Sequence, residues 1–395
     1  MEIHPQALQR VFHAGLAFCL LEVVLQLWPQ RKLWFTNPPR GLKAPYGVDL
    51  PFEWPQVAQR ISEFVGRSLQ VIPSAALLCG LFVSISLLLL GIETGPAYGL
   101  AWFCLTALFH QNPMIVHSGD AFLRIACAVF AVASLLKPGF DEAFLFTLTR
   151  SLLLGQYIQA LGWKLVNGRW RKLHAVQDVL ADIQYARAWV VRLADRTRQT
   201  NWRSSCHVAT AAVMVTQATI VVALLVPGFE AYAALLIGAL HLGIRGTMRL
   251  GHLNSVCLVS AILPIQHVWV EMDSRVVFAL SPLIFYFLFG DQRSPLLRLR
   301  FVRFLVLTMR WLGLSYTWRM FAEPEDCIAN SEAPANDSGS IECVFWERMA
   351  SMGLATMDGK FLNLQARKFS ENLSLVRGAT IDRIRSWAEC KKNGR

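Results

Sequence analysis

Residues 208–247, VATAAVMVTQATIVVALLVPGFEAYAALLIGALHLGIRGT, hold two long apolar runs joined around the turn-forming segment PGFE. The runs, 208–227 and 231–247, approach the roughly 20 residues that a helix needs to cross a bilayer. Neither run alternates regularly between apolar and polar side chains, as the strands of a membrane barrel do. Because a backbone that crosses hydrocarbon must satisfy its hydrogen bonds within the segment, we expect both runs to be transmembrane helices.

Similar apolar runs recur along the chain. Hydrophobic residues make up 54% of the 395 residues and charged residues 16%, against about 25% charged residues in an ordinary soluble protein. We therefore predict an all-α fold, a polytopic bundle of about nine transmembrane helices in the cell membrane. The predicted spans are 11–28, 72–91, 97–110, 121–136, 143–164, 208–227, 231–247, 253–270 and 276–290.

Three segments outside these spans differ from them in character. Residues 56–71 and 175–197 are basic and amphipathic, and they predict helices that lie along the membrane interface. The chain becomes polar near residue 321, where loop-like sequence begins. We therefore predict a transmembrane domain over 1–320 and a short polar, soluble carboxy-terminal tail over 321–395.

The formal net charge of +11 could indicate a nucleic-acid partner, but no long basic tract is present. Lys and Arg lie beside the apolar runs instead, which favours the headgroups of a lipid bilayer as the partner and excludes nucleic acid. If the nine spans alternate, one side of the membrane holds only Arg10, Lys137 and Arg275. The positive-inside rule then predicts an amino terminus outside the cell.

The nine cysteines include no CxxC pair, and five of them lie inside apolar runs. This distribution is typical of small core residues and excludes a disulfide framework. We expect no metal site.

Ionisable side chains inside predicted spans are candidates for function, because burying a charge in a bilayer is costly. They include Arg124, Arg150, Lys164 and His241. A structural role is the alternative for each. Arg and Lys at the end of a span commonly reach the headgroups, and a single histidine commonly hydrogen-bonds a neighbouring helix.

One stretch, HQNPMIVHSGDAFLR at 110–124, concentrates polar residues around a predicted turn. Asn112, His117, Asp120 and Arg124 at that depth should hydrogen-bond one another. Asp120 stands where the N-cap of the next helix is expected, so capping explains part of the cluster. Capping does not explain His117.

Five segments in order resemble the HTTM (horizontally transferred transmembrane) proteins, relatives of the vitamin K-dependent gamma-carboxylase. The resemblance covers about residues 10–290, with one last segment beyond them. The segments are LWFTNPPRGL, NPMIVHSGDAFLR, QYIQALGWKLVNGRW, ALHLGIRGTMRLGHLNS and WRMFAEP. The resemblance implies a cytoplasmic amino terminus, opposite to the charge count. The sequence departs from the carboxylase in one respect: the carboxylase has a large extramembrane carboxy-terminal portion, whereas about 70 residues follow Glu323 here.

The resemblance places Lys164 on the lysine held to deprotonate vitamin K hydroquinone, and His117 on the histidine that assists it. A desolvated lysine favours its neutral form and can act as a base, helped here by the positive field of Arg169 and Arg171. The expected cofactor or substrate is a quinone such as vitamin K hydroquinone. Trp102, Phe103, Tyr157 and Trp163 could line its pocket, or could simply face lipid or the interface.

Two functions from different classes follow. The first is a membrane enzyme that uses Lys164 as a base on a quinone or another lipid-soluble substrate, with modification of a substrate protein as a coupled reaction. The second is a non-catalytic membrane subunit that binds a partner protein. A transporter is a third reading, but no inverted halves with matched Gly or Pro breaks are seen.

Overall fold

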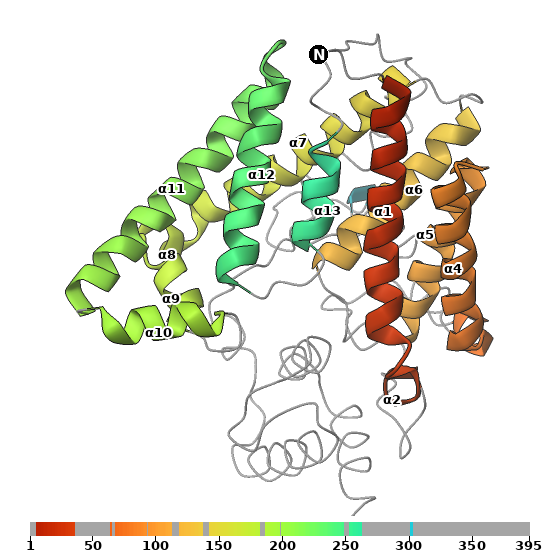
Figure 1. The fold of residues 1–395 in the computed structure, drawn as a ribbon, viewed down its shortest axis with the longest axis horizontal. Coiled ribbons are helices and arrows are strands. Elements are labelled where there is room, and N and C mark those ends of the chain that lie inside the picture. Colours follow the sequence, from red (N-terminus) through yellow and green to blue (C-terminus); the bar gives the residue numbers. More distant parts are fainter. Residues whose placement is uncertain are drawn as a thin grey trace, which may run out of the picture. The chain divides into compact units, whose positions relative to one another are not determined.

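The computed structural model describes residues 5–35, 64, 68–92, 94–112, 118–136, 142–181, 186–197, 199–248, 253–262 and 301–302. These residues are helical apart from their turns and one isolated bridge between Ala186 and Met248, so the all-α prediction is confirmed. The helices are drawn in Figure 1. They are α1 (Pro5–Leu27), α2 (Arg31–Phe35), α4 (Ser74–Leu90), α5 (Thr94–Gln111), α6 (Ser118–Leu136), α7 (Glu142–Val166), α8 (Gly168–Arg171), α9 (Ala175–Ala181), α10 (Ala188–Arg196), α11 (Gln199–Leu225), α12 (Glu230–Thr247) and α13 (Leu253–Ser260).

Most of the predicted spans correspond to a helix. Seven helices cover the apolar runs from which they were predicted, namely α1, α4, α5, α6, α7, α11 and α12. In addition, α13 covers the start of the run 253–270. Within the described residues, two segments are long and apolar enough to cross a membrane, Ala7–Leu27 and Gln199–Leu225. The span at 276–290 lies outside the described residues. The nine-span bundle therefore stays a prediction.

The chain divides into two compact units. The first contains 1–22, 81–103 and 118–321, and the second contains 23–80, 104–117 and 322–395. Each is described separately below. The predicted domain boundary near residue 320 lies outside the described residues.

In the first unit, α7 packs against α6, α11 and α13, and α12 lies between α11 and α13. The turn from α11 to α12 contains Pro227, which cannot donate a backbone hydrogen bond, and Gly228, whose φ of +86° suits glycine. These residues end α11 and reverse the chain. The two apolar runs therefore form a helical hairpin.

A single arginine joins this hairpin to α7. Arg150 Nε donates to the carbonyl oxygen of Leu224, 2.6 Å away, and Arg150 Nη1 lies 3.1 Å from Glu230 Oε1. Leu224 is in the last turn of α11, where carbonyl groups have no partner within the helix. Glu230 is the first residue of α12, where a negative charge is favourable. Arg150 therefore satisfies the end of one helix and the start of the next.

Close helix contacts in the same unit depend on two glycines. A Cβ atom on Gly15 of α1 would lie 2.7 Å from a methyl group of Val259, and one on Gly95 of α5 would lie 2.5 Å from Ser134 Cβ. Both distances are shorter than real Cβ contacts. These glycines let the helix backbones approach each other more closely than any larger residue would allow.

In the second unit, Asn112 holds the end of α5 against α2. Its Nδ2 donates to the carbonyl oxygen of Trp34 over 2.8 Å, and the Trp34 indole donates to Gln30 Oε1. The neighbouring Gln111 Nε2 donates to the carbonyl oxygens of Leu69 and Ile72. Side-chain amides thus satisfy backbone groups near the helix ends.

The prediction of one continuous surface helix over 175–197 is wrong. The helix is interrupted between α9 and α10, where Ala186 bridges to Met248 and Arg187 has extended dihedral angles, φ −74° and ψ 148°. The Arg187 backbone N–H donates to Thr247 O, so tertiary pairing replaces the helical hydrogen bond at this point. Most of the other predicted interfacial helix, 56–71, lies outside the described residues.

Two ion pairs differ in burial, and we expect them to contribute differently to the free energy of unfolding. The side chains of Arg150 and Glu230 are 15% and 5% exposed, whereas those of Arg169 and Asp178 are 37% and 39% exposed. We expect Glu230→Ala to lower the free energy of unfolding by about 3–5 kcal/mol, because it leaves a buried guanidinium without its carboxylate. The matched Asp178→Ala variant should lose at most about 1 kcal/mol. Denaturant unfolding in detergent micelles measures both, and equal losses would contradict this account.

The close contact at Gly95 gives a second test. Gly95→Ala should destabilise the protein by about 1–3 kcal/mol, because Ser134 Cβ can move away only if its backbone moves. Gly238 in α12 has open space around a new Cβ atom, so Gly238→Ala should instead stabilise the helix by up to about 1 kcal/mol. Thermal unfolding of the two variants distinguishes the effects. A stable Gly95→Ala protein would show that α5 and α6 are not in close contact.

Candidate functional site

Lys164 is buried at the end of α7. It stands in the last turn of the helix, its exposed fraction is 2%, and its ammonium nitrogen lies 4.7 Å from the centroid of the Trp170 ring. A cation over the face of an indole is stabilised by the ring's quadrupole. The lysine predicted as a base is thus directed into the protein.

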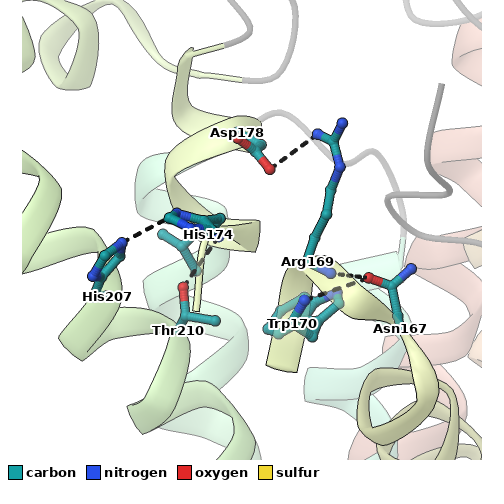
Figure 2. A network of polar contacts seen from close by, with 8 residues as sticks. Asn167, Arg169, Trp170, His174, Asp178, His207 and Thr210 are labelled. Carbon is teal, nitrogen blue, oxygen red and sulfur yellow. Dashed lines mark hydrogen bonds and ion pairs between the residues drawn. The ribbon is translucent and has the colours of Figure 1, made fainter. Parts of the chain in front are cut away.

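The position of Trp170 follows from a local cap. Asn167 Oδ1 accepts hydrogen bonds from the backbone N–H groups of Arg169 and Trp170, at 3.0 and 3.4 Å, and so caps the short helix α8. Figure 2 shows Asn167 and Trp170 side by side at this turn. The sequence NGRW therefore turns the chain back at once after α7 and brings the buried indole to Lys164.

A polar network fastens the segment after α8 to α11 (Figure 2). His207 Nε2 and His174 Nδ1 are 3.2 Å apart, so one ring donates and the other accepts. Thr210 Oγ1 accepts from the backbone N–H of Val176 at 3.2 Å and donates to Cys206 O. The chain beneath Lys164 is thereby held against a helix of membrane-crossing length.

Arg169, predicted to supply a positive field at Lys164, belongs to this network, where its charge is paired. Its Nη1 lies 3.0 Å from Asp178 Oδ2, so a carboxylate compensates its charge. Arg171 is exposed to solvent. Pairing with Asp178 and exposure to solvent weaken the positive field that these two arginines were expected to supply at Lys164, and that role stays a prediction.

His241 lies in a buried chain of three side chains. The Tyr157 hydroxyl is 2.8 Å from His241 Nε2, and His241 Nδ1 is 3.0 Å from Asn254 Oδ1. Because an amide oxygen only accepts, Nδ1 must be the donor, which leaves Nε2 to accept the tyrosine proton. Asn254 thus selects the tautomer of His241, and His241 orients the hydroxyl of Tyr157.

Tyr157 connects this chain of side chains to Lys164. The two residues are seven positions apart on α7 and therefore lie on one face of the helix, two turns from each other. Tyr157 is in turn bonded to His241 on α12. All four side chains, those of Tyr157, Lys164, His241 and Asn254, are buried. Together with the ring of Trp170 against Lys164, they form what we call the α7 polar site.

Two of the predicted site residues, one acidic and one basic, lie on α6. Asp120 and Arg124 are both buried, and both interact with other groups. Because α6 begins at Ser118, Asp120 lies within the first turn and not at the N-cap, so that detail of the prediction is wrong. A carboxylate in a first turn is favourable for the same electrostatic reason as a cap.

The remaining predicted residues do not extend the α7 polar site. Asn112 belongs to the second unit, where it binds Trp34 O. His117 lies outside the described residues. Of the four aromatic residues expected around a pocket, Tyr157 is fully buried and Phe103 is largely exposed, while Trp102 and Trp163 are half-buried.

Sequence reasoning missed two members of the α7 polar site. Asn254 stands inside the quoted segment ALHLGIRGTMRLGHLNS, and Trp170 ends QYIQALGWKLVNGRW. Neither residue is ionisable, so a search for buried charges passes over both. A polar side chain thirteen residues after His241 carries no periodic signal, because the chain between them is not one helix.

Comparison with protein-family models, with curated proteins and with solved structures finds no match. The resemblance to HTTM proteins accordingly depends on the quoted segments alone. Among the described residues, no group of three or more His, Cys, Asp and Glu side chains is placed to hold a metal ion. The amine, phenol and imidazole of the α7 polar site are groups that can exchange protons.

The hydrogen bond between Tyr157 and His241 can be tested by stability. Tyr157→Phe removes the donor to Nε2 inside a buried site and should lower the free energy of unfolding by about 1–3 kcal/mol. Tyr232 on α12 is largely exposed, so Tyr232→Phe should change it by no more than about 0.5 kcal/mol. Chemical unfolding in detergent measures both. A Tyr157→Phe variant as stable as the control would refute the buried hydrogen bond.

Proposed function

We propose that the protein is a multi-pass membrane enzyme of the HTTM type, in which the amine of Lys164 takes a proton from a reduced quinone or a similarly lipid-soluble substrate. The observation that carries the proposal is the burial of Lys164 over Trp170, on the helix face that also carries Tyr157. A lysine in such surroundings is uncommon unless it has a partner or a chemical role.

The exposed surface of α11 supports the placement in a membrane. Val208, Val215 and Val222 recur every seven residues along one face, and each is more than half exposed. An uncharged apolar face of this length is costly in water and favourable in hydrocarbon. The multi-pass arrangement in the cell membrane is the finer part of the proposal.

The proposed proton transfer to Lys164 balances in atoms and in charge. The neutral amine accepts the hydroxyl proton of the quinol, which leaves a quinolate anion and an ammonium group. Loss of solvent favours the neutral form of a lysine before the transfer. The face of Trp170 then stabilises the ammonium group after it. His117 remains the proposed second residue, from the resemblance alone.

Tyr157 supplies an oriented hydroxyl two helical turns from Lys164. Because its proton is directed to His241 Nε2, the orientation of its oxygen is fixed. In the proposed reaction, this oxygen positions the ring of the substrate and keeps the reacting hydroxyl at Lys164. Asn254 acts indirectly by holding His241.

A non-catalytic membrane subunit is the second candidate, and one observation favours it. Both ring nitrogens of His241 have partners, and the Lys164 ammonium lies against an aromatic ring. Polar groups satisfied in this way also occur in purely structural helix contacts. On this reading the protein binds a partner protein and Lys164 contributes to folding.

Replacement of Lys164 separates the two candidates. Lys164→Ala and Lys164→Arg should each lower quinol turnover by roughly 100-fold or more, because a guanidinium does not release its proton in this range. Lys172→Ala, which removes an exposed lysine from the same segment, should leave turnover unchanged. Dissolved oxygen, reduced to hydrogen peroxide, is the two-electron oxidant that converts the quinolate to the quinone, so oxygen uptake with a reduced naphthoquinone measures turnover. An anaerobic difference spectrum of the quinolate measures the proton transfer.

The opposite results have definite meanings. Full activity of Lys164→Arg would show that Lys164 is not the base in the reaction. Unfolding of Lys164→Ala, together with no quinolate signal in the unaltered protein, would favour the structural subunit.

A further inference from the structure

We infer that α10 is a membrane-surface anchor whose exposed arginines bind the headgroups of anionic phospholipids. The inference rests on the membrane placement proposed above and adds a specific lipid-binding surface to it. We define the α10 anchor as Trp189, Arg192, Leu193 and Arg196.

The position of α10 is set by the end of α12. The carbonyl oxygens of Arg245, Gly246 and Thr247 close that helix, and such groups lack partners within it. Three hydrogen-bond donors at the start of α10 bind these carbonyl oxygens. Arg187 Nε donates to Arg245 O at 2.7 Å, Trp189 Nε1 to Gly246 O at 2.8 Å, and Arg187 N to Thr247 O at 2.9 Å.

These three bonds set α10 across the hairpin. Figure 1 shows α10 running crosswise at the end of the hairpin where α11 begins and α12 ends. Only two residues separate the end of α10 at Arg196 from the start of α11 at Gln199. If α11 and α12 cross a membrane, α10 therefore lies at its boundary and along its surface.

The side chains of α10 sort into faces that fit this position. Val190 is buried against the protein, whereas Trp189 and Leu193 are 47% and 46% exposed. Trp189 and Leu193 are four residues apart, so they form one apolar ridge. Tryptophan is enriched at membrane interfaces, where its ring is in apolar surroundings and its N–H is bonded. Here the indole N–H is already bonded to Gly246 O.

The charges next to the ridge select the lipid. Arg192 and Arg196 are also four residues apart and both are exposed, beside the ridge of Trp189 and Leu193. Within α10 the only acidic side chain is Asp195. A guanidinium forms two parallel hydrogen bonds with a phosphate group. An anionic phospholipid also removes the excess positive charge, which a zwitterionic lipid does not.

Hydrogen exchange in lipid nanodiscs tests the anchor. The full chain is placed in discs of phosphatidylcholine alone or of phosphatidylcholine mixed with phosphatidylglycerol, and exchange of the amides of 188–196 is followed by mass spectrometry. We expect roughly tenfold slower exchange in the anionic discs, and we expect salt to reduce the difference.

Three double variants assign the effect. Arg192→Gln with Arg196→Gln should remove the difference between the two lipids. Arg10→Gln with Lys32→Gln removes the same charge at two other exposed positions and should retain it. Trp189→Ser with Leu193→Ser should speed exchange in both lipids, because the apolar ridge no longer inserts.

Each other outcome overturns a defined claim. Equal exchange in the two lipids, with the protein inserted, overturns the anchor and leaves the membrane placement. A lipid difference that persists without Arg192 and Arg196 places the lipid site elsewhere and also overturns the anchor. A protein that stays soluble without detergent and does not enter the discs overturns the membrane placement and the anchor together.

Discussion

The contact of Arg150 with Leu224 O and Glu230 is the interaction on which the rest of the first unit depends. A helical hairpin inside an apolar bundle leaves unsatisfied carbonyl groups at the end of one helix and favours a negative charge at the start of the next. One guanidinium from α7 meets both needs. It also fixes which residues of α7 face the hairpin. Removal of its carboxylate would leave a largely buried charge without its counter-charge.

With α7 held at that point, its later residues face α12 and α13 at successive turns. Tyr157 lies two turns beyond Arg150 and meets His241, and Lys164 lies two turns beyond Tyr157. The seven-residue spacing of Arg150, Tyr157 and Lys164 thus places three polar side chains along one face of a single helix. Each of them reaches a buried partner: Glu230, His241 or the ring of Trp170.

The same need to satisfy backbone groups shapes the surface segments. Asn167 caps α8 and so brings Trp170 beneath Lys164. Arg187 and Trp189 complete the end of α12 and so interrupt the amphipathic segment that would otherwise continue as one helix. In both places a polar side chain near a helix end determines the path of the chain. The α7 polar site and the α10 anchor are consequences of these caps.

The amino-acid sequence was sufficient for the all-α class, for the positions of most long helices and for Lys164 and His241 as buried polar residues. These features follow from apolar runs and from the cost of a polar group inside them, which are local properties of the chain. It was not sufficient for the partners of those residues. Asn254 stands on another helix than His241, which it contacts, and the break before α10 depends on Thr247 and Met248 at the end of α12. Hydrogen bonds between distant segments compete with local helix formation, and their outcome depends on how the helices pack, which no periodicity in the sequence records.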